Sequence, residues 1–413
     1  MPSSETLRAQ TTPEDGALFS EGLHDFILRP EAPIAFTEMV RQKGTIPISD
    51  IKAGTRISIP LEKTCTLVED INLRFKPPAL PIPGGATYAR YCDYLAYAII
   101  EKVEIMFTSN NLQTFTMDTE WSATQFYCDE KRANEDKLVG GNLSAAARNT
   151  YAANPYPLQV RIPTPWKDIK SHNLIISALA SKPTINIYFK NPASFIESDG
   201  AKPAEIVFTN CSIRYEQIHT TGHTRLELTA IQNEPNGIAY LYDDTAQFDF
   251  DIPADYFKST GNKFPAELRS IDGPIRKLRF IVRTVDQLDP TLNNTSPYDI
   301  DTKYIEGMES YIVSNNMELA DANGEQQIDG VRDVQKFHHC RSDTLQVEKL
   351  WEEFPEAMNC ASGNASFGNY TNPILNLSNP SLAGSHPALR VTVMYWRHNW
   401  LVHQRGVIQR VWR

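Results

Sequence analysis

Segments in which polar and apolar residues alternate follow one another along most of the chain. Thr55–Pro60 is the clearest, with the alternation expected of a half-buried strand. Ile99–Phe107 is similar and ends at a turn of Ser109, Asn110 and Asn111. Parallel strands need helical crossovers of about a dozen residues, and the strand-like segments are not separated by such helices. The pattern therefore predicts an all-β fold of antiparallel sandwiches or barrels.

Other segments extend this pattern through both halves of the chain. Further strands are expected at 67–75, 158–162, 174–179, 184–189, 205–218, 225–231, 246–252, 277–285, 308–313, 373–377 and 389–396. Thr119–Lys137 is polar and is expected to contain a short helix within an insertion.

A second helix is predicted near residue 350. Ser342 or Asp343 supplies an N-cap, and Pro355 supplies a stop. The apolar residues between them are spaced as on one face of a helix: Val347, Leu350, Trp351 and Phe354. We interpret this segment as a loop insertion that leaves the all-β class unchanged.

Length and an internal repeat indicate two domains. The chain has 413 residues, and single hydrophobic cores stop growing at about 250–300 residues. Val103–Gln113 aligns with Met308–Glu318, and the offset from Ser109 to Ser314 is 205 residues, close to half the length. Glu104 and Glu309 coincide in this alignment, as do the Ser-Asn-Asn turns. We infer two tandem β-sandwiches of similar topology, at 45–220 and 221–413, preceded by an N-terminal arm at 1–44.

Charge and cysteine usage exclude several classes of protein. The formal net charge is -10, which argues against a surface built to coat nucleic-acid phosphates. No apolar run is long enough to span a membrane, and the first thirty residues lack the pattern of a secretory signal. The six cysteines form no CxxC pair, so free thiols are expected rather than disulfides or a zinc site: Cys65, Cys92, Cys128, Cys211, Cys340 and Cys360.

Motifs for catalysis are missing. The sequence has no P-loop, no G-x-S-x-G elbow and no H-E-x-x-H. His338, His339 and Cys340 are adjacent, and neighbouring residues of a strand point to opposite faces, so they are not expected to bind one ion. The paired aspartates at 243–244, 249–251 and 299–301 are interpreted as solvated loops rather than as glycosidase carboxylates or calcium ligands. We expect no catalytic residues, no cofactor, no metal and no enzyme activity.

Two segments are basic. Lys263–Arg279 and Arg405–Arg413 combine arginines with aromatic residues, a composition that also occurs on nucleic-acid surfaces. We favour contacts between subunits or an inward-facing rim for both, with the C-terminal arginines meeting an acidic surface of a neighbour.

Three stretches resemble one known family, the double jelly-roll major capsid proteins of nucleocytoplasmic large DNA viruses, polinton-like viruses and virophages. Arg90–Phe107 is similar to the family's aromatic lead into an I-x-x-V-E-I strand. Glu309–Asn316 repeats it where the second jelly roll has its counterpart. The third stretch is Asn376–Pro380 followed by Leu389–Leu401 and Gly406. The chain departs from the family at Ser109 and Asn110, where many members have a Gly-Gly turn.

The resemblance implies two antiparallel eight-stranded jelly rolls with short helices in loop insertions. It also implies a structural subunit of the virion, assembled inside the host cell into pseudo-hexameric homotrimers that tile an icosahedral shell. The implied partners are other copies of the chain, neighbouring capsomers, and penton, minor capsid or cement proteins. The arm at 1–44 is the candidate for contacts with such proteins or with an internal membrane. No sequence-specific nucleic acid is expected.

A carbohydrate-binding or carbohydrate-active β-sandwich is the competing class. It requires a concave strip of aromatic residues with carboxylates. The six tryptophans are too dispersed to suggest such a strip: Trp121, Trp166, Trp351, Trp396, Trp400 and Trp412.

Overall fold

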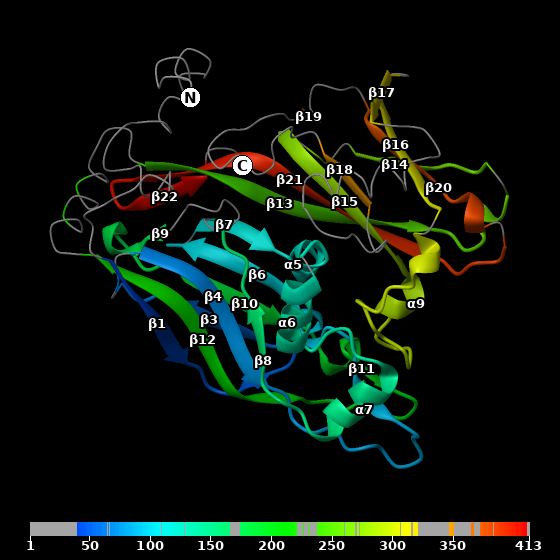
Figure 1. The fold of residues 1–413 in the computed structure, drawn as a ribbon, viewed down its shortest axis with the longest axis horizontal. Helices are drawn as coiled ribbons and strands as arrows, with labels where there is room; N and C mark the ends of the chain where they lie inside the picture. Colours follow the sequence, from blue (N-terminus) through cyan, green and yellow to red (C-terminus); the bar gives the residue numbers. More distant parts are fainter. Residues whose placement is uncertain are drawn as a thin grey trace.

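The computed structural model has four main antiparallel sheets and a few short helices (Figure 1). It describes residues 39–410 apart from 64, 66, 109, 128, 166–173, 221–225, 227–229, 231–237, 260, 269–270, 272, 306, 315–316, 321–346, 351–364, 367–371 and 383. The expected all-β class is therefore confirmed.

Two sheets form a first sandwich from the N-terminal half of the chain. The larger has the order β1-β12-β4-β8, in which β2 also pairs with β12 and β9 with β4. The smaller has the order β3-β10-β6-β7. Their bounds are β1 Met39–Pro47, β2 Ile51–Lys52, β3 Arg56–Pro60, β4 Leu67–Lys76, β6 Ile100–Phe107, β7 Asn110–Phe115, β8 Leu158–Arg161, β9 Leu174–Ile175, β10 Thr184–Phe189 and β12 Val207–Thr220. A separate ribbon pairs β5 (Ala89–Tyr91) with β11 (Ile196–Ser198).

The C-terminal half forms a second sandwich from two further sheets. The larger has the order β13-β21-β15-β18, with β19 on β15 and β22 on β21, and the smaller has the order β14-β20-β16-β17. Their bounds are β13 Ile238–Ile252, β14 Phe264–Glu267, β15 Pro274–Thr284, β16 Glu309–Ser314, β17 Met317–Ala320, β18 Val347–Leu350, β19 Ala365–Ser366, β20 Ile374–Ser378, β21 Leu389–Gln404 and β22 Val407–Arg410.

The two sandwiches repeat one topology. In each, a path of four strands in the larger sheet faces a path of four in the smaller, which makes the eight strands of a jelly roll. The hairpins β6–β7 and β16–β17 occupy the same end of the smaller sheets. These hairpins contain the two segments that the sequence repeat aligned, so the predicted duplication of a sandwich is confirmed.

Alternate residues of the strands build the cores. In β6, Val103, Ile105 and Phe107 are buried while the residues between them are partly exposed. One core cluster fills the first sandwich, and a second fills the other around Phe280, Ile312 and similar side chains. The first cluster also takes in Met394 and Trp396 of β21, so the two halves share part of their apolar packing.

Helices lie in the connections between strands. The α-helices are α4 Leu95–Ala98, α5 Met117–Thr124, α6 Asp129–Val139, α7 Ala145–Ala153 and α9 Val285–Leu288. Single 3-10 turns are η2 Ile176–Ala178, η3 Pro192–Ser194, η4 Tyr256–Lys258, η5 Thr302–Tyr304 and η7 Pro380–Leu382. The helical insertion expected within Thr119–Lys137 is confirmed as α5 and α6.

Some local predictions are wrong. Val347–Leu350, expected as helix, forms β18 and pairs with Lys277–Phe280 of β15. The edge of β15 offers unpaired backbone groups, and this tertiary pairing overrides a helical spacing in a short segment. The segment 174–179 is a strand only to Ile175 and then becomes η2. The strand expected at 225–231 lies outside the described residues except Leu226 and Ala230, which are helical.

Truncation of a buried strand residue tests the core. Ile187 of β10 is 0% exposed, so Ile187→Ala is expected to lower the free energy of unfolding by about 2–5 kcal/mol because it leaves a cavity. Val40 of β1 is 64% exposed, and the control Val40→Ala is expected to change stability by less than about 0.5 kcal/mol. Urea denaturation measures both, and equal effects would contradict the described core.

Candidate functional site: the interface between the two sandwiches

The second sandwich lies with the outer face of its larger sheet against the first sandwich. β7 and α5 supply the contacts from the first sandwich, and β13, β15 and β21 supply those from the second (Figure 1). The side chain of Gln113 donates to Thr245 at 3.4 Å, and that of Thr116 donates to Gln247. Because its inner face covers its own core, much of the larger sheet of the second sandwich is buried on both sides, whereas Asp249 and Asp251 near the end of β13 are exposed.

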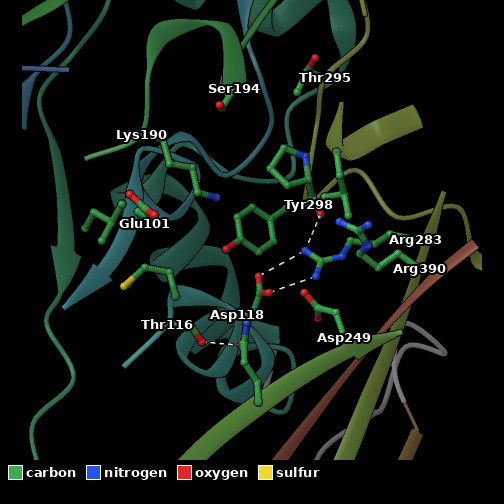
Figure 2. Close-up of a pocket in the computed structure, with 15 residues that line it drawn as sticks. Glu101, Thr116, Asp118, Lys190, Ser194, Asp249, Arg283, Thr295, Tyr298 and Arg390 are labelled. Atoms are coloured by element: carbon green, nitrogen blue, oxygen red, sulfur yellow. Dashed lines mark hydrogen bonds and ion pairs between the residues drawn. The ribbon is translucent and has the colours of Figure 1, made fainter. Parts of the chain in front are cut away.

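An ion pair between Asp118 and Arg283 joins α5 to β15 (Figure 2). Arg283 donates through Nη2 to Asp118 Oδ2 at 3.0 Å and through Nη1 to Oδ1 at 3.3 Å, a bidentate geometry. Nη2 also donates to Thr392 Oγ1 at 2.5 Å, and Arg283 is only 4% exposed. Burial raises the pKa of the Asp118 carboxyl, but the Arg283 guanidinium lowers it by more, so the net pKa is below its ordinary value.

Aromatic side chains surround this pair. Tyr298, from the loop after α9, lies with its ring centroid 5.4 Å from that of Trp121 on α5. It also meets Tyr94 at 6.3 Å and Tyr97 at 6.2 Å, both edge-on. Burial raises the pKa of the Tyr298 hydroxyl well above its ordinary value, and the Asp118 carboxylate adds to the rise. Tyr298 therefore stays neutral and packs a residue of the second half into the first sandwich.

A second arginine of β15 is enclosed between two rings. The guanidinium of Arg279 lies 3.9 Å from the centroid of Phe126 and 5.0 Å from that of Trp396. It donates to Ser122 at 3.2 Å and is 2% exposed. Cation–π contacts from both sandwiches therefore fix this charge in the interface.

Farther along the same interface, Arg148 of α7 bridges the halves. It pairs with Glu197 of β11 and donates to Asp299, beyond α9, at 3.3 Å. Glu197 also accepts from Arg90 at 2.7 Å. The guanidinium of Arg148 thus connects a buried carboxylate of the first sandwich to a loop of the second.

A polar cavity of about 270 Å³ opens beside the Asp118–Arg283 pair (Figure 2). Lys190, Asp249 and Arg390 lie around it with these two residues. Burial lowers the pKa of the Lys190 ammonium, against an opposing effect of Asp118. The cavity has both signs of charge and is slightly below the usual size of a small-molecule pocket.

The aspartates of the second sandwich are not all in solvated loops, as the sequence suggested. Asp243 and Asp244 lie within β13 and are only 2% and 3% exposed. Asp243 pairs with Arg276 at 3.0 Å, and Asp244 pairs with Arg397 at 2.6 Å and with Arg410 at 3.5 Å. The prediction was wrong because these carboxylates are neutralised by arginines on other strands of the same sheet, which spacing along the chain does not reveal.

The other acidic pairs divide between strand and loop. Asp249 and Asp251 lie in β13, where Asp251 forms a bidentate pair with Arg390 at 2.7 and 2.8 Å. For Asp299 and Asp301 the loop interpretation is confirmed, since their side chains are 57% and 41% exposed.

The basic segments find partners within the same chain. Arg276 and Arg279 of the first segment and Arg410 of the second lie in the contacts described above. Contact of the C-terminal arginines with an acidic surface of another subunit stays a prediction. Residues 411–413 lie outside the described part of the chain.

No group of three or more potential metal-ligating side chains occurs within the described residues. His338, His339 and Cys340 lie outside them, as do Cys128 and Cys360. Cys65, Cys92 and Cys211 are buried free thiols. Burial raises the pKa of the Cys211 thiol to about 11, so this thiol is protonated at neutral pH.

Among the described helices, none has the length and apolar character needed to cross a membrane.

Asp93 is a buried carboxyl behind the interface, next to Tyr94. Its Oδ1 accepts from the backbone N–H of Leu143 at 3.0 Å, and the residue is 8% exposed. Burial raises the pKa of Asp93 to about 6, although the hydrogen bond from Leu143 and the charge of Arg148 oppose the rise.

No family model matches the chain, and no curated protein matches it. Solved structures do match. A PBCV-1 protein fitted into a cryo-EM reconstruction of the virophage Sputnik is 12% identical, with 92% of this chain and 98% of that chain covered and a TM-score of 0.67. The PBCV-1 virus capsid is 13% identical, with 92% and 98% covered and a TM-score of 0.65. The Faustovirus major capsid protein is 9% identical, with 89% and 91% covered and a TM-score of 0.62.

At sequence identities this low, the structural match establishes a shared fold only. The chain thus has the double jelly-roll architecture of these capsid proteins across nearly its whole length. The fold class expected from the sequence is confirmed in both its sandwiches and its tandem arrangement.

Removal of one partner tests the interfacial ion pair. Asp118→Asn leaves Arg283 buried without a carboxylate, so the free energy of unfolding is expected to fall by about 3–5 kcal/mol. Asp251→Asn is the matched control, since that Asp–Arg pair has the same bidentate geometry but side chains that are 34% and 49% exposed; it is expected to cost about 0–1 kcal/mol. Because the pKa of Asp118 is lowered on folding, the wild-type advantage is present above about pH 4 and is lost below it.

Asp93 gives the opposite pH dependence. A pKa raised to about 6 in the folded state means that the folded protein binds the proton more readily, so stability falls as the pH rises from about 4 to about 6. Asp93→Asn keeps an acceptor for Leu143 N–H and is expected to be more stable than wild type above about pH 7, with the gain vanishing near pH 4. Thermal unfolding across this range measures the gain, and a constant difference between the proteins would contradict the assignment.

Proposed function

We propose that this chain is the major capsid protein of an icosahedral DNA virus and acts as a structural subunit. The observation that carries the proposal is the tandem repetition of one jelly-roll topology in both halves. Support also comes from the fold shared over about nine tenths of the chain with the PBCV-1 and Faustovirus capsid proteins. The corresponding location is the virion capsid.

The finer arrangement that we propose is a homotrimer. Two equivalent sandwiches in each chain supply six similar units to a ring of three chains, and such a ring fits hexagonal positions of a shell. The trimer would then contact neighbouring capsomers, and multivalent contacts would stabilise the lattice even where each one is weak. Pentons, minor capsid or cement proteins and an internal membrane remain proposed partners. The arm at 1–44 is the proposed site for them, and the sandwiches are proposed to be domains at 45–220 and 221–413.

One exposed sheet face is the candidate for contact between chains. The outer face of β13-β21-β15 is covered by the first sandwich, but the equivalent face of β1-β12-β4 bears the exposed Arg214 and the half-buried Arg74 and Lys76. In a closed ring, this cationic face meets the second sandwich of the next chain.

The role that we propose is geometric rather than catalytic. The charged groups at the interface are paired with one another, and their effect is to fix one sandwich on the other. A carbohydrate-active sandwich would need convergent carboxylates beside exposed aromatic rings, and Asp243, Asp244 and Asp251 of β13 pair with arginines instead.

Native mass and electron microscopy test this proposal. The purified chain is expected to form a trimer of about three times 46.6 kDa that persists on dilution and, with its partners, forms shells. The double substitution Arg74→Glu/Arg214→Glu is expected to weaken the trimer by at least about tenfold in dissociation constant, since like charges across an interface are costly. Lys182→Glu, a charge change on a different part of the first sandwich, is the control. A stable monomer that binds polysaccharide would overturn the proposal.

A further inference from the structure

Lys202 lies in the loop after β11, and its ammonium is surrounded by oxygens from both halves of the chain. Nζ is 3.0 Å from the carbonyl oxygen of Ala193 in the first sandwich. It is 3.1 Å from the carbonyl of Pro290, 2.7 Å from that of Leu292 and 3.0 Å from Thr295 Oγ1, all in the loop after α9. Four oxygens at these distances form a cage around one positive charge.

The loop that supplies three of these oxygens is closed upon itself. Thr295 Oγ1 donates to the carbonyl oxygens of Asp289 at 2.7 Å and Leu292 at 3.0 Å. Asp289 Oδ1 accepts from the backbone N–H of Thr291 at 2.8 Å and from its hydroxyl at 2.7 Å. Thr295 is 1% exposed. The carbonyls thus converge on a single point, which the ammonium occupies.

The cage is made of neutral oxygens. The two nearest carboxylates are engaged elsewhere, Glu197 by Arg90 and Arg148 and Asp289 by Thr291. Carbonyl and hydroxyl oxygens without a carboxylate are the groups that replace the water shell of a monovalent cation such as potassium. Burial lowers the pKa of the Lys202 ammonium, and the charges of Glu197 and Asp289 oppose this.

Further contacts place the same loop on the first sandwich. The backbone N–H of Ser198 donates to the carbonyl of Asn293 at 3.1 Å, and Tyr88 Oη donates to Asn294 Oδ1 at 2.9 Å. The Lys202 ammonium adds one positively charged contact between the loop and the first sandwich.

We infer that the oxygens of Ala193, Pro290, Leu292 and Thr295 form a monovalent-cation site that the chain fills with its own Lys202 ammonium. This tethered cation fastens the loop 289–296 to the first sandwich and so helps to set the orientation of one sandwich on the other. The inference concerns a single chain and does not depend on the capsid role.

Replacement of the ammonium tests the inference. Lys202→Met keeps the length and apolar stem of the side chain but leaves the cage without a cation. Amide hydrogen exchange in residues 291–296 is expected to accelerate by at least about tenfold, the factor that corresponds to the loss of one charge-assisted hydrogen bond. Potassium or ammonium chloride is expected to restore much of the protection in this variant, while choline chloride at the same ionic strength is not, because choline is too large for the cage.

Two further variants complete the experiment. Lys182→Met removes a surface lysine that pairs with Glu62 and is 46% exposed, and it is expected to change neither exchange in the loop nor its response to salt. Thr295→Val keeps Lys202 but removes one oxygen of the cage and the hydroxyl that donates to Asp289 and Leu292. Exchange in the loop is therefore expected to accelerate without being restored by potassium, and this variant remains informative if Lys202→Met does not fold.

Unchanged exchange in Lys202→Met would overturn the role of the ammonium. Equal effects of choline and potassium would overturn the cation site. Trimer formation is measured separately, so failure of the capsid proposal leaves these outcomes distinguishable.

Discussion

The burial of one sheet on both faces is the constraint on which the rest of this structure depends. β21 is buried along nearly its whole length, because one face covers the core of the second sandwich and the other lies against the first. The part of the sheet that the first sandwich covers has no solvated side to carry charge. The arginines of β15 in this part of the sheet therefore need partners. Asp118 pairs with Arg283, and the rings of Phe126 and Trp396 enclose Arg279. The relative orientation of the sandwiches follows from the need to bring these partners together.

Pairing of charge within the chain also changes how its composition should be understood. An acidic total with local basic segments suggested surfaces that attract other molecules, yet much of this charge is cancelled between neighbouring strands. Asp243, Asp244 and Arg397 are nearly buried, and all three lie on strands of the larger sheet of the second sandwich. Pairs of this kind contribute less to net stability than to specificity, since removal of one partner leaves a buried charge. They link strands within the larger sheet of the second sandwich.

The proposed role, the tiling of a surface, needs shape rather than a reactive pocket. The cavity beside Asp118 is small and has opposing charges on its walls, in keeping with a joint between rigid bodies. This chain shares its fold with capsid proteins although the sequence identity is only about 12%. Many different sequences therefore satisfy the alternating burial of a jelly roll. Such freedom is expected where function lies in the placement of sandwiches and not in particular catalytic side chains.

The sequence by itself determined the all-β class, most strand positions and the doubling of the sandwich. Alternation, and the recurrence of Val103–Gln113 in the second half, can be recognised along the chain without knowing which residues are in contact. It did not determine β18, since pairing with β15 outweighed a helical spacing at Val347 and Leu350. Nor did it place Asp118 beside Arg283, which are 165 residues apart, or close the cage around Lys202. Those contacts join segments distant in the chain, and only the packing of one sandwich on the other brings them within hydrogen-bonding distance.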